Sequence, residues 1–151
     1  MRTLTFDRAL GALVLVLAAS FAHADAPLRT IGVKIGTHAL KVEVVDTDET
    51  RSKGLMFRKT MPANDGMLFV FEDVGYHSMW MKNTYLPLSV AFIDGEGKIL
   101  NILDMEPLME ITYTAAGPAR YAIETNKGWF AGKKIEAGAK VTGLPLVKPG
   151  R

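Results

Sequence analysis

The sequence predicts a mainly β protein, a compact antiparallel barrel or sandwich with one or two short helices, and two observations lead to that fold class. Short segments in which apolar and polar residues alternate recur along the chain, separated by turns rich in Gly, Pro, Asn and Asp. Only one or two stretches carry the capping residues or the spacing of a helix. Roughly seven to nine short strands with so few helices are typical of a barrel or sandwich.

The first 24 residues are expected to be a secretory signal peptide and not part of the fold. Arg2 and Arg8 precede an uncharged run over residues 9–22, and the run ends in the Ala22-His23-Ala24 pattern that signal peptidase accepts. The run is shorter than the roughly 20 residues that cross a bilayer, so no stable membrane anchor is expected. We predict cleavage after Ala24, a periplasmic or secreted location, and a single domain over residues 25–151.

Composition narrows the classes of partner. The chain contains no Cys, so its core must form without disulfides, which residues 25–151 are long enough to do. The net charge of +2 falls to about +1 when the signal peptide leaves, and no block of Lys and Arg is present. We therefore expect no binding to nucleic acid. We also expect a monomer.

A hairpin and one helix are predicted at the start of the domain. Residues 31–35 and 39–45 alternate apolar with polar, and a Gly-Thr-His turn joins them. Asp46 or Thr47 can cap a helix that runs from Asp48 to about residue 57.

The middle of the chain contains the predicted core strands. Residues 67–71 are apolar on both faces, which predicts a central strand. Residues 88–93 and 98–105 are predicted to form a hairpin around the turn Asp94-Gly95-Glu96-Gly97. Residues 120–125 are predicted to form a further strand.

The remaining segments are patterned more weakly. Residues 111–117 fit either a loop or a short edge segment, and residues 129–134 fit a single helical turn. A Gly-rich pair of strands is predicted over residues 135–144.

Four motifs follow one another in order along the chain: Arg51-x-x-Gly54-Leu55-Met56-x-Arg58, Gly66-Met67-Leu68-Phe69-x-Phe71, Trp80-Met81-Lys82-Asn83-Thr84 and Pro87-Leu88, with Glu124 near the C-terminal strand. Together they resemble the domain-of-unknown-function 192 family, small and often exported proteins of bacteria and archaea. The resemblance runs from about Val33 to Val141 and implies a compact β-rich fold with no established activity. This chain departs from the family pattern at Ser89, where an acidic residue is common, and at Met79, where an aromatic is common.

The candidate site is the stretch of residues 76–88, which gathers aromatic, thioether, imidazole, amine and amide groups. Trp80 and Tyr85 offer flat faces, and Lys82 and Asn83 offer a charge and a two-way hydrogen-bonding group. The residues expected to bind a ligand are Arg51, Trp80, Lys82, Asn83, Tyr85 and Glu124. We predict non-catalytic binding of a small molecule or a cell-envelope component there.

Each of these residues also has a purely structural interpretation. Trp80 could belong to the core, and Asn83 could serve a turn. Arg51 and Arg58 could clamp an anion or pair with an acidic side chain, for which Glu124 and Glu106 are the candidate partners.

A copper(I) site is the alternative function. If residues 77–81 are extended, His77, Met79 and Met81 project from one face, and an imidazole with two thioethers is a soft ligand set suited to Cu(I). Met also fills irregular cores, so packing is the other interpretation, and no cofactor is required by the sequence.

An enzyme is the third possibility, and the sequence argues against it. His77 and Ser78 are adjacent and would face opposite ways on a strand, so they cannot form a nucleophile–base pair. A pair of Lys82 and Glu124 could do acid–base chemistry only if the fold brings them together. No Gly-x-Ser-x-Gly, His-Glu-x-x-His or glycine-rich phosphate loop is present.

Overall fold

The computed structural model describes residues 27–146. The predicted signal peptide and its cleavage point after Ala24 lie outside these residues, so both stay predictions. Within 27–146, no helix has the length and apolar character needed to cross a membrane. The elements follow in the order β1 (Thr30–Ile35), β2 (His38–Val45), α1 (Asp48–Lys53), β3 (Asp65–Gly75), β4 (Ser78–Met79), β5 (Leu88–Ile93), β6 (Ile99–Met105), β7 (Tyr113–Thr114), β8 (Ala119–Asn126), α2 (Trp129–Gly132) and β9 (Val141–Thr142).

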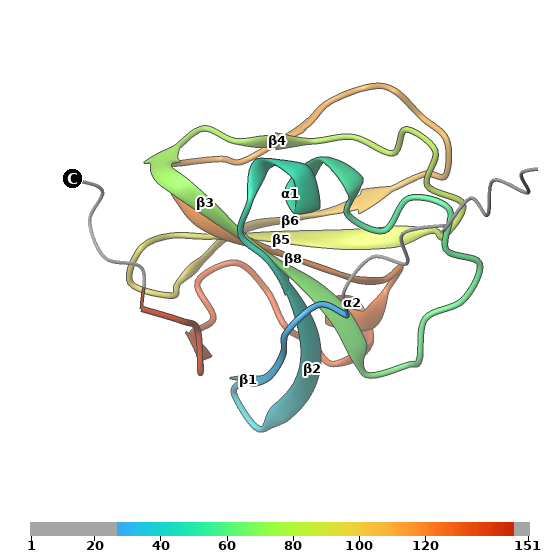
Figure 1. Ribbon diagram of the computed structural model, residues 1–151. Helices are drawn as coiled ribbons and strands as arrows, with labels where there is room; N and C mark the ends of the chain where they lie inside the picture. The colour runs from blue at the N-terminus through green and yellow to red at the C-terminus, as the bar shows by residue number, and fades with distance from the viewer. Residues whose placement is uncertain (1–26, 147–151) are drawn as a thin grey trace, which may run out of the picture.

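The predicted mainly β fold with two short helices is confirmed. Seven strands form one curled sheet in the order β6-β5-β8-β3-β2-β1-β9, and β4 pairs with β7 in a separate two-stranded sheet. The large sheet makes a half-barrel, with α1 and β4 above it and the β1–β2 hairpin curving below (Figure 1).

One pairing departs from the predicted antiparallel arrangement, because β2 and β3 run parallel. Helix α1 lies between these strands in the sequence, and a crossover of this kind returns the chain to the same end of the sheet. The sheet is therefore mixed. The predicted hairpins β1–β2 and β5–β6 are antiparallel, as expected for strands joined by tight turns.

Two clusters of buried side chains cover opposite faces of the central strands β3, β5 and β8. Every residue of β5 is buried, and alternate residues of β3 point into different clusters, as Leu68 does into one and Phe69 into the other. The strand predicted over residues 67–71 is thus central, and it extends in both directions to Asp65 and Gly75.

The first helix is shorter than predicted. Thr47 caps it, with the Thr47 hydroxyl accepting from the Thr50 backbone N–H and Thr50 bonding back. The helix ends at Lys53 because Gly54 follows with φ of +47°, a conformation that L-residues rarely adopt. The prediction that it reaches about residue 57 was wrong, because Gly54 ends the helix.

The prediction of a Gly-rich strand pair over residues 135–144 was also wrong. Only Val141–Thr142 forms a strand there, and it pairs with β1. The residues before it lie against the start of β6. There the Ile99 N–H donates to the Ala139 carbonyl over 2.9 Å, and the backbones of Lys98 and Lys140 form an isolated antiparallel β-bridge. This segment therefore links the two edges of the large sheet at one end.

Candidate functional site

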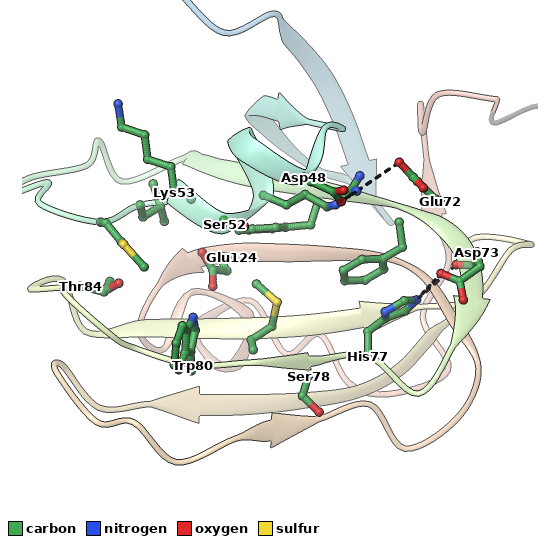
Figure 2. A pocket seen from close by; sticks show the side chains of 17 residues that line it. Asp48, Ser52, Lys53, Glu72, Asp73, His77, Ser78, Trp80, Thr84 and Glu124 are labelled. Carbon is green, nitrogen blue, oxygen red and sulfur yellow. Dashed lines mark hydrogen bonds and ion pairs between the residues drawn. The ribbon is translucent and has the colours of Figure 1, made fainter. Parts of the chain in front are cut away.

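A pocket of about 400 Å³ lies between α1, β3, β8 and the stretch that contains β4. Arg51 from α1, Trp80 just after β4 and Glu124 from β8 all line it. In Figure 2, Glu124 lies behind the opening, Trp80 and Thr84 stand on one side, and His77 and Asp73 stand on the other. The arginine motif and the Trp80 stretch therefore meet in one cavity.

Glu124 is the most unusual residue of the pocket. It is 4% exposed, and its neighbours on the adjacent strands are Met67 on β3 and Val90 on β5, both apolar. Its carboxyl group makes no hydrogen bond or ion pair with any residue in 27–146, and burial raises its pKa to about 8. No side-chain N or O atom in this part of the chain is both fully buried and unpartnered, so the carboxyl tip is open to the pocket.

Arg51 is anchored by acceptors other than the predicted Glu124. Its Nη1 donates to the carbonyl oxygens of Asp46 and Val70 over 2.8 and 2.9 Å. Its Nη2 donates to Asp48 Oδ1 over 2.5 Å and lies 3.5 Å from Glu72 Oε1. Arg51 thus connects α1 to β3 along one wall of the pocket. Sequence spacing alone did not single out these partners.

Arg58 corrects the prediction in a second way. Its guanidinium makes a two-pronged contact with Glu43 on β2, one hydrogen bond of 2.9 Å and one shorter. The hydrogen bonds from Arg58 hold the pKa of Glu43 below its usual value. Glu106, the other predicted partner, pairs instead with Lys127. Sequence separation gave no means of choosing among the acidic residues.

Part of the pocket wall is apolar. Leu55, Phe69, Phe71 and Met79 contribute to it, and all four are buried in the cluster that covers this face of the sheet. The His77 ring stacks on Phe71, with centroids 3.8 Å apart, and its Nε2 lies 3.2 Å from the Asp73 carbonyl oxygen. Phe69 and Phe71 belong to a motif noted in the sequence, yet they were assigned only to the core.

Three predicted ligand-binding residues lie beside the pocket and not in it. Lys82 places its Nζ 5.1 Å from the centroid of the Trp80 ring. Asn83 has φ of +53° in a turn, and its carbonyl accepts from the Phe57 N–H. Tyr85 is 48% exposed and meets the Phe57 ring edge-on. Of these three, Lys82 is the one whose side chain contacts the lining residue Trp80.

The three predicted copper ligands are divided between the pocket and the core. His77 and Met79 line the pocket, whereas Met81 is fully buried and does not. Within residues 27–146, no three His, Asp or Glu side chains are grouped as metal ligands.

An acidic rim was missed by the sequence reasoning. The carboxylates of Asp48, Glu72 and Asp73 line the pocket and are largely exposed. The available signal was Glu72-Asp73 at the end of a long apolar strand, where the polar residues emerge from the core beside the candidate stretch.

Comparison with known proteins gives a family and two similar structures. The family model DUF192, described as uncharacterized ACR, COG1430, matches residues 31–143. A crystal structure of a candidate transcription regulator from Sinorhizobium meliloti 1021 has 32% identity and a TM-score of 0.75, covering 78% of this chain and 96% of that one. A protein of unknown function from Novosphingobium aromaticivorans DSM 12444 has 32% identity and a TM-score of 0.73, covering 78% and 93%. No curated protein matches the chain.

Proposed function

The chain belongs to the DUF192 family, a family of unknown function, and from that premise we propose that it is an exported, non-catalytic binding protein for a small organic molecule. The proposed site is the pocket between α1 and β4, and the molecule is a free solute or part of a cell-envelope component.

One observation carries the proposal. Arg51, Trp80 and Glu124 come from three separate elements and line a single pocket. Its volume of about 400 Å³ falls within the range of about 300–1,000 Å³ that is usual for small-molecule sites. Small-molecule sites combine apolar side chains with placed polar groups, and this pocket has both, with charged groups along its rim.

The polar groups of the pocket support binding over catalysis. The Ser78 hydroxyl is hydrogen-bonded to Thr114 over 2.8 Å, and His77 is stacked on Phe71. A nucleophile needs a base within hydrogen-bond reach, and neither side chain is arranged as a partner of the other. Lys82 does not line the pocket that contains Glu124, which gives no support to the acid–base pair considered from the sequence.

The test compares two aromatic residues of the same stretch. Trp80 and Tyr85 are 46% and 48% exposed, but only Trp80 lines the pocket. We would screen a fragment library against residues 25–151 by ligand-observed NMR and measure the affinities of the hits. Trp80→Ala should weaken them at least tenfold, and Tyr85→Ala should change them less than twofold. Hits that bind both variants equally, or a library without hits, would contradict the proposal.

Copper(I) binding is a second candidate, favoured by His77 and Met79 lining the same pocket. The test is an anaerobic Cu(I) titration in competition with a chromophoric chelator. If the proposal holds, a Met79→Leu, Met81→Leu variant should lose tight binding. Met105→Leu, which changes an equally buried Met outside the proposed ligand set, should keep it. Absence of tight binding by the unaltered protein would remove copper from consideration.

A further inference from the structure

The Glu124 carboxyl lacks the partner that buried polar groups normally have. More than nine-tenths of the residue is buried, both cross-strand neighbours are apolar, and no hydrogen bond from residues 27–146 reaches the carboxyl. The large majority of buried side-chain polar atoms are hydrogen-bonded. A polar group that loses its hydrogen bonds to water and gains none in the protein costs free energy. Among residues 27–146, Glu124 lines the pocket and its carboxyl is open to it, so a partner can reach the carboxyl by this route.

The basic group best placed to attract an anion is already engaged. The two Nη atoms of Arg51 reach two backbone carbonyls and two carboxylates, those of Asp48 and Glu72. Anion clamps use the paired N–H groups of guanidinium. Because the N–H groups of Arg51 are directed at acceptors within the protein, Arg51 holds the structure together and is not a vacant anion site.

The rim has the charge that attracts a cation. Three carboxylates stand there: Asp48 and Glu72 lie next to Arg51, and Asp73 lies next to His77. The charged or titratable side chains that line the pocket with Glu124 are Asp48, Arg51 and Lys53 from α1, Glu72 and Asp73 from β3, and His77 before β4. None of them accounts for the protonation of Glu124, whose shifted pKa is caused by burial alone. A cationic ligand beside the Glu124 carboxyl would therefore not have to displace a basic side chain already paired with it.

The walls suit the remainder of an organic cation. Phe69, Phe71 and Met79 offer apolar and polarisable surface in the same pocket as the carboxyl. The Trp80 ring already holds the Lys82 ammonium 5.1 Å from its centroid, which shows that its face accepts a cation. A bare metal ion would leave these walls unused, whereas an amine on an apolar stem would cover them.

We propose that the ligand of this pocket is an organic cation whose protonated amine pairs with Glu124, with its apolar part against Phe69, Phe71 and Met79; this inference rests on the binding function proposed above. At pH 7 the free protein carries a proton on Glu124. When an ammonium R–NH₃⁺ enters, the carboxyl O–H bond breaks, the proton passes to water, and the carboxylate accepts hydrogen bonds from the ammonium. Binding should therefore release close to one proton per ligand at pH 7, falling to none well above pH 8.

The experiment uses matched probes. The panel is a series of aryl and alkyl primary amines, such as 2-phenylethylamine, each with its hydroxyl and carboxylate analogue, here 2-phenylethanol and phenylacetate. Calorimetric titrations of residues 25–151 at pH 6, 7 and 9, in buffers of different ionisation enthalpy, give both the affinity and the number of protons released. Amines should bind at least tenfold tighter than their analogues, and their affinity should rise with pH up to about 8.

Glu124→Gln is the critical variant, because it keeps the size and removes the charge. Amine affinity should fall at least tenfold and proton release should vanish, while Glu136→Gln, an exposed acid that does not line the pocket, should change neither. If hydroxyl or carboxylate probes bind as tightly as amines and their binding depends on Trp80, the proposal of an organic cation is wrong. The proposed binding function would still hold. A panel with no binding at millimolar concentration, together with a fragment screen without hits, would overturn both. If Glu124→Gln does not fold, the pH dependence of amine affinity and the number of protons released by the unaltered protein still test the proposal.

Discussion

At the scale of single residues, Glu124 ties the stability of the fold to pH. Its pKa is about 8 in the folded protein, against an ordinary value of 4.5, so the folded state holds the proton more tightly than the unfolded state does. The stabilisation is complete below about pH 4.5 and is lost as the pH rises through the folded pKa near 8. The unfolding free energy attributable to this residue should fall by about 1.4 kcal/mol per pH unit across that window.

Glu124→Gln should therefore stabilise the protein increasingly as the pH rises. Relative to the unaltered protein, we expect a gain of about 1 kcal/mol near pH 5 and of about 4 kcal/mol at pH 8, because the amide never has to ionise. Urea unfolding of both proteins at pH 5, 7 and 8.5 measures the difference, in which other titrating groups cancel. A gain of the same size at every pH would mean that Glu124 does not carry the shifted pKa.

The same residue marks the limit of sequence reasoning at this scale. Glu124 could be named as a candidate because it lies in a predicted strand near the motifs. Its isolation could not be predicted, because that depends on Met67 and Val90 being its neighbours on the adjacent strands. Arg51 shows the converse, since two of its acceptors are backbone carbonyls, which leave no trace in residue identities.

At the scale of elements, the pair of Glu43 and Arg58 fastens the segment after α1 to β2. The Glu43 pKa lies below its ordinary value of 4.5 because Arg58 donates hydrogen bonds to it, so this stabilisation is present above pH 4.5 and is lost as the pH falls through the folded pKa. Both side chains are about one-third exposed, which lowers the contribution through solvent screening.

A double-mutant cycle with Glu43→Gln and Arg58→Gln should give a coupling free energy of about 1 kcal/mol at pH 7 and close to zero at pH 2.5. Urea unfolding of the four proteins at the two pH values measures it. The i, i+3 pair of Asp48 and Arg51 offers no equivalent control, since Arg51 also holds two carbonyls. A coupling that survives at pH 2.5 would mean that packing, and not charge, joins these elements.

Element boundaries were predictable where the local pattern decides them. The first hairpin follows from alternation around a Gly turn, and residues 88–93 form a strand with the predicted limits. The parallel pairing of β2 with β3 was not predictable, because it depends on how α1 returns the chain across the sheet. Residues 135–144 were misassigned since their Gly content reflects turns around a single two-residue strand.

At the scale of the whole molecule, the site exists only after assembly. Trp80 stands over the sheet on the β4 layer, Arg51 is on the helix, and Glu124 is at the sheet's centre, so the pocket is the space between the layers (Figures 1 and 2). The sequence indicated the three residues separately. Whether they converge was undetermined, because convergence depends on the curl of the sheet.

We expect that curl to depend on the contact between Gly97 and Val141, which gives the last prediction. Gly97 has φ of +87°, and a Cβ there would lie 2.7 Å from the Val141 carbonyl oxygen, while its own carbonyl accepts from the Val141 N–H over 2.8 Å. Gly97→Ala should push residues 138–142 away from β6 and lower the unfolding free energy by about 2 kcal/mol or more, through strain and lost pairing. The uncovered edges of β6 and β9 should then pair between molecules, since an open strand edge is a template for association.

Gly95→Ala is the matched control, because Gly95 lies in the same turn and a Cβ there meets no atom within 4 Å. Urea unfolding and sedimentation velocity over a range of concentrations compare the two variants with the unaltered domain, residues 25–151. The domain and Gly95→Ala should sediment as monomers, and Gly97→Ala should show concentration-dependent association. If Gly97→Ala stays as stable and as monomeric as Gly95→Ala, then residues 138–142 follow the curl of the sheet without holding it, and the shape of the pocket is set by the packing of α1 on β3.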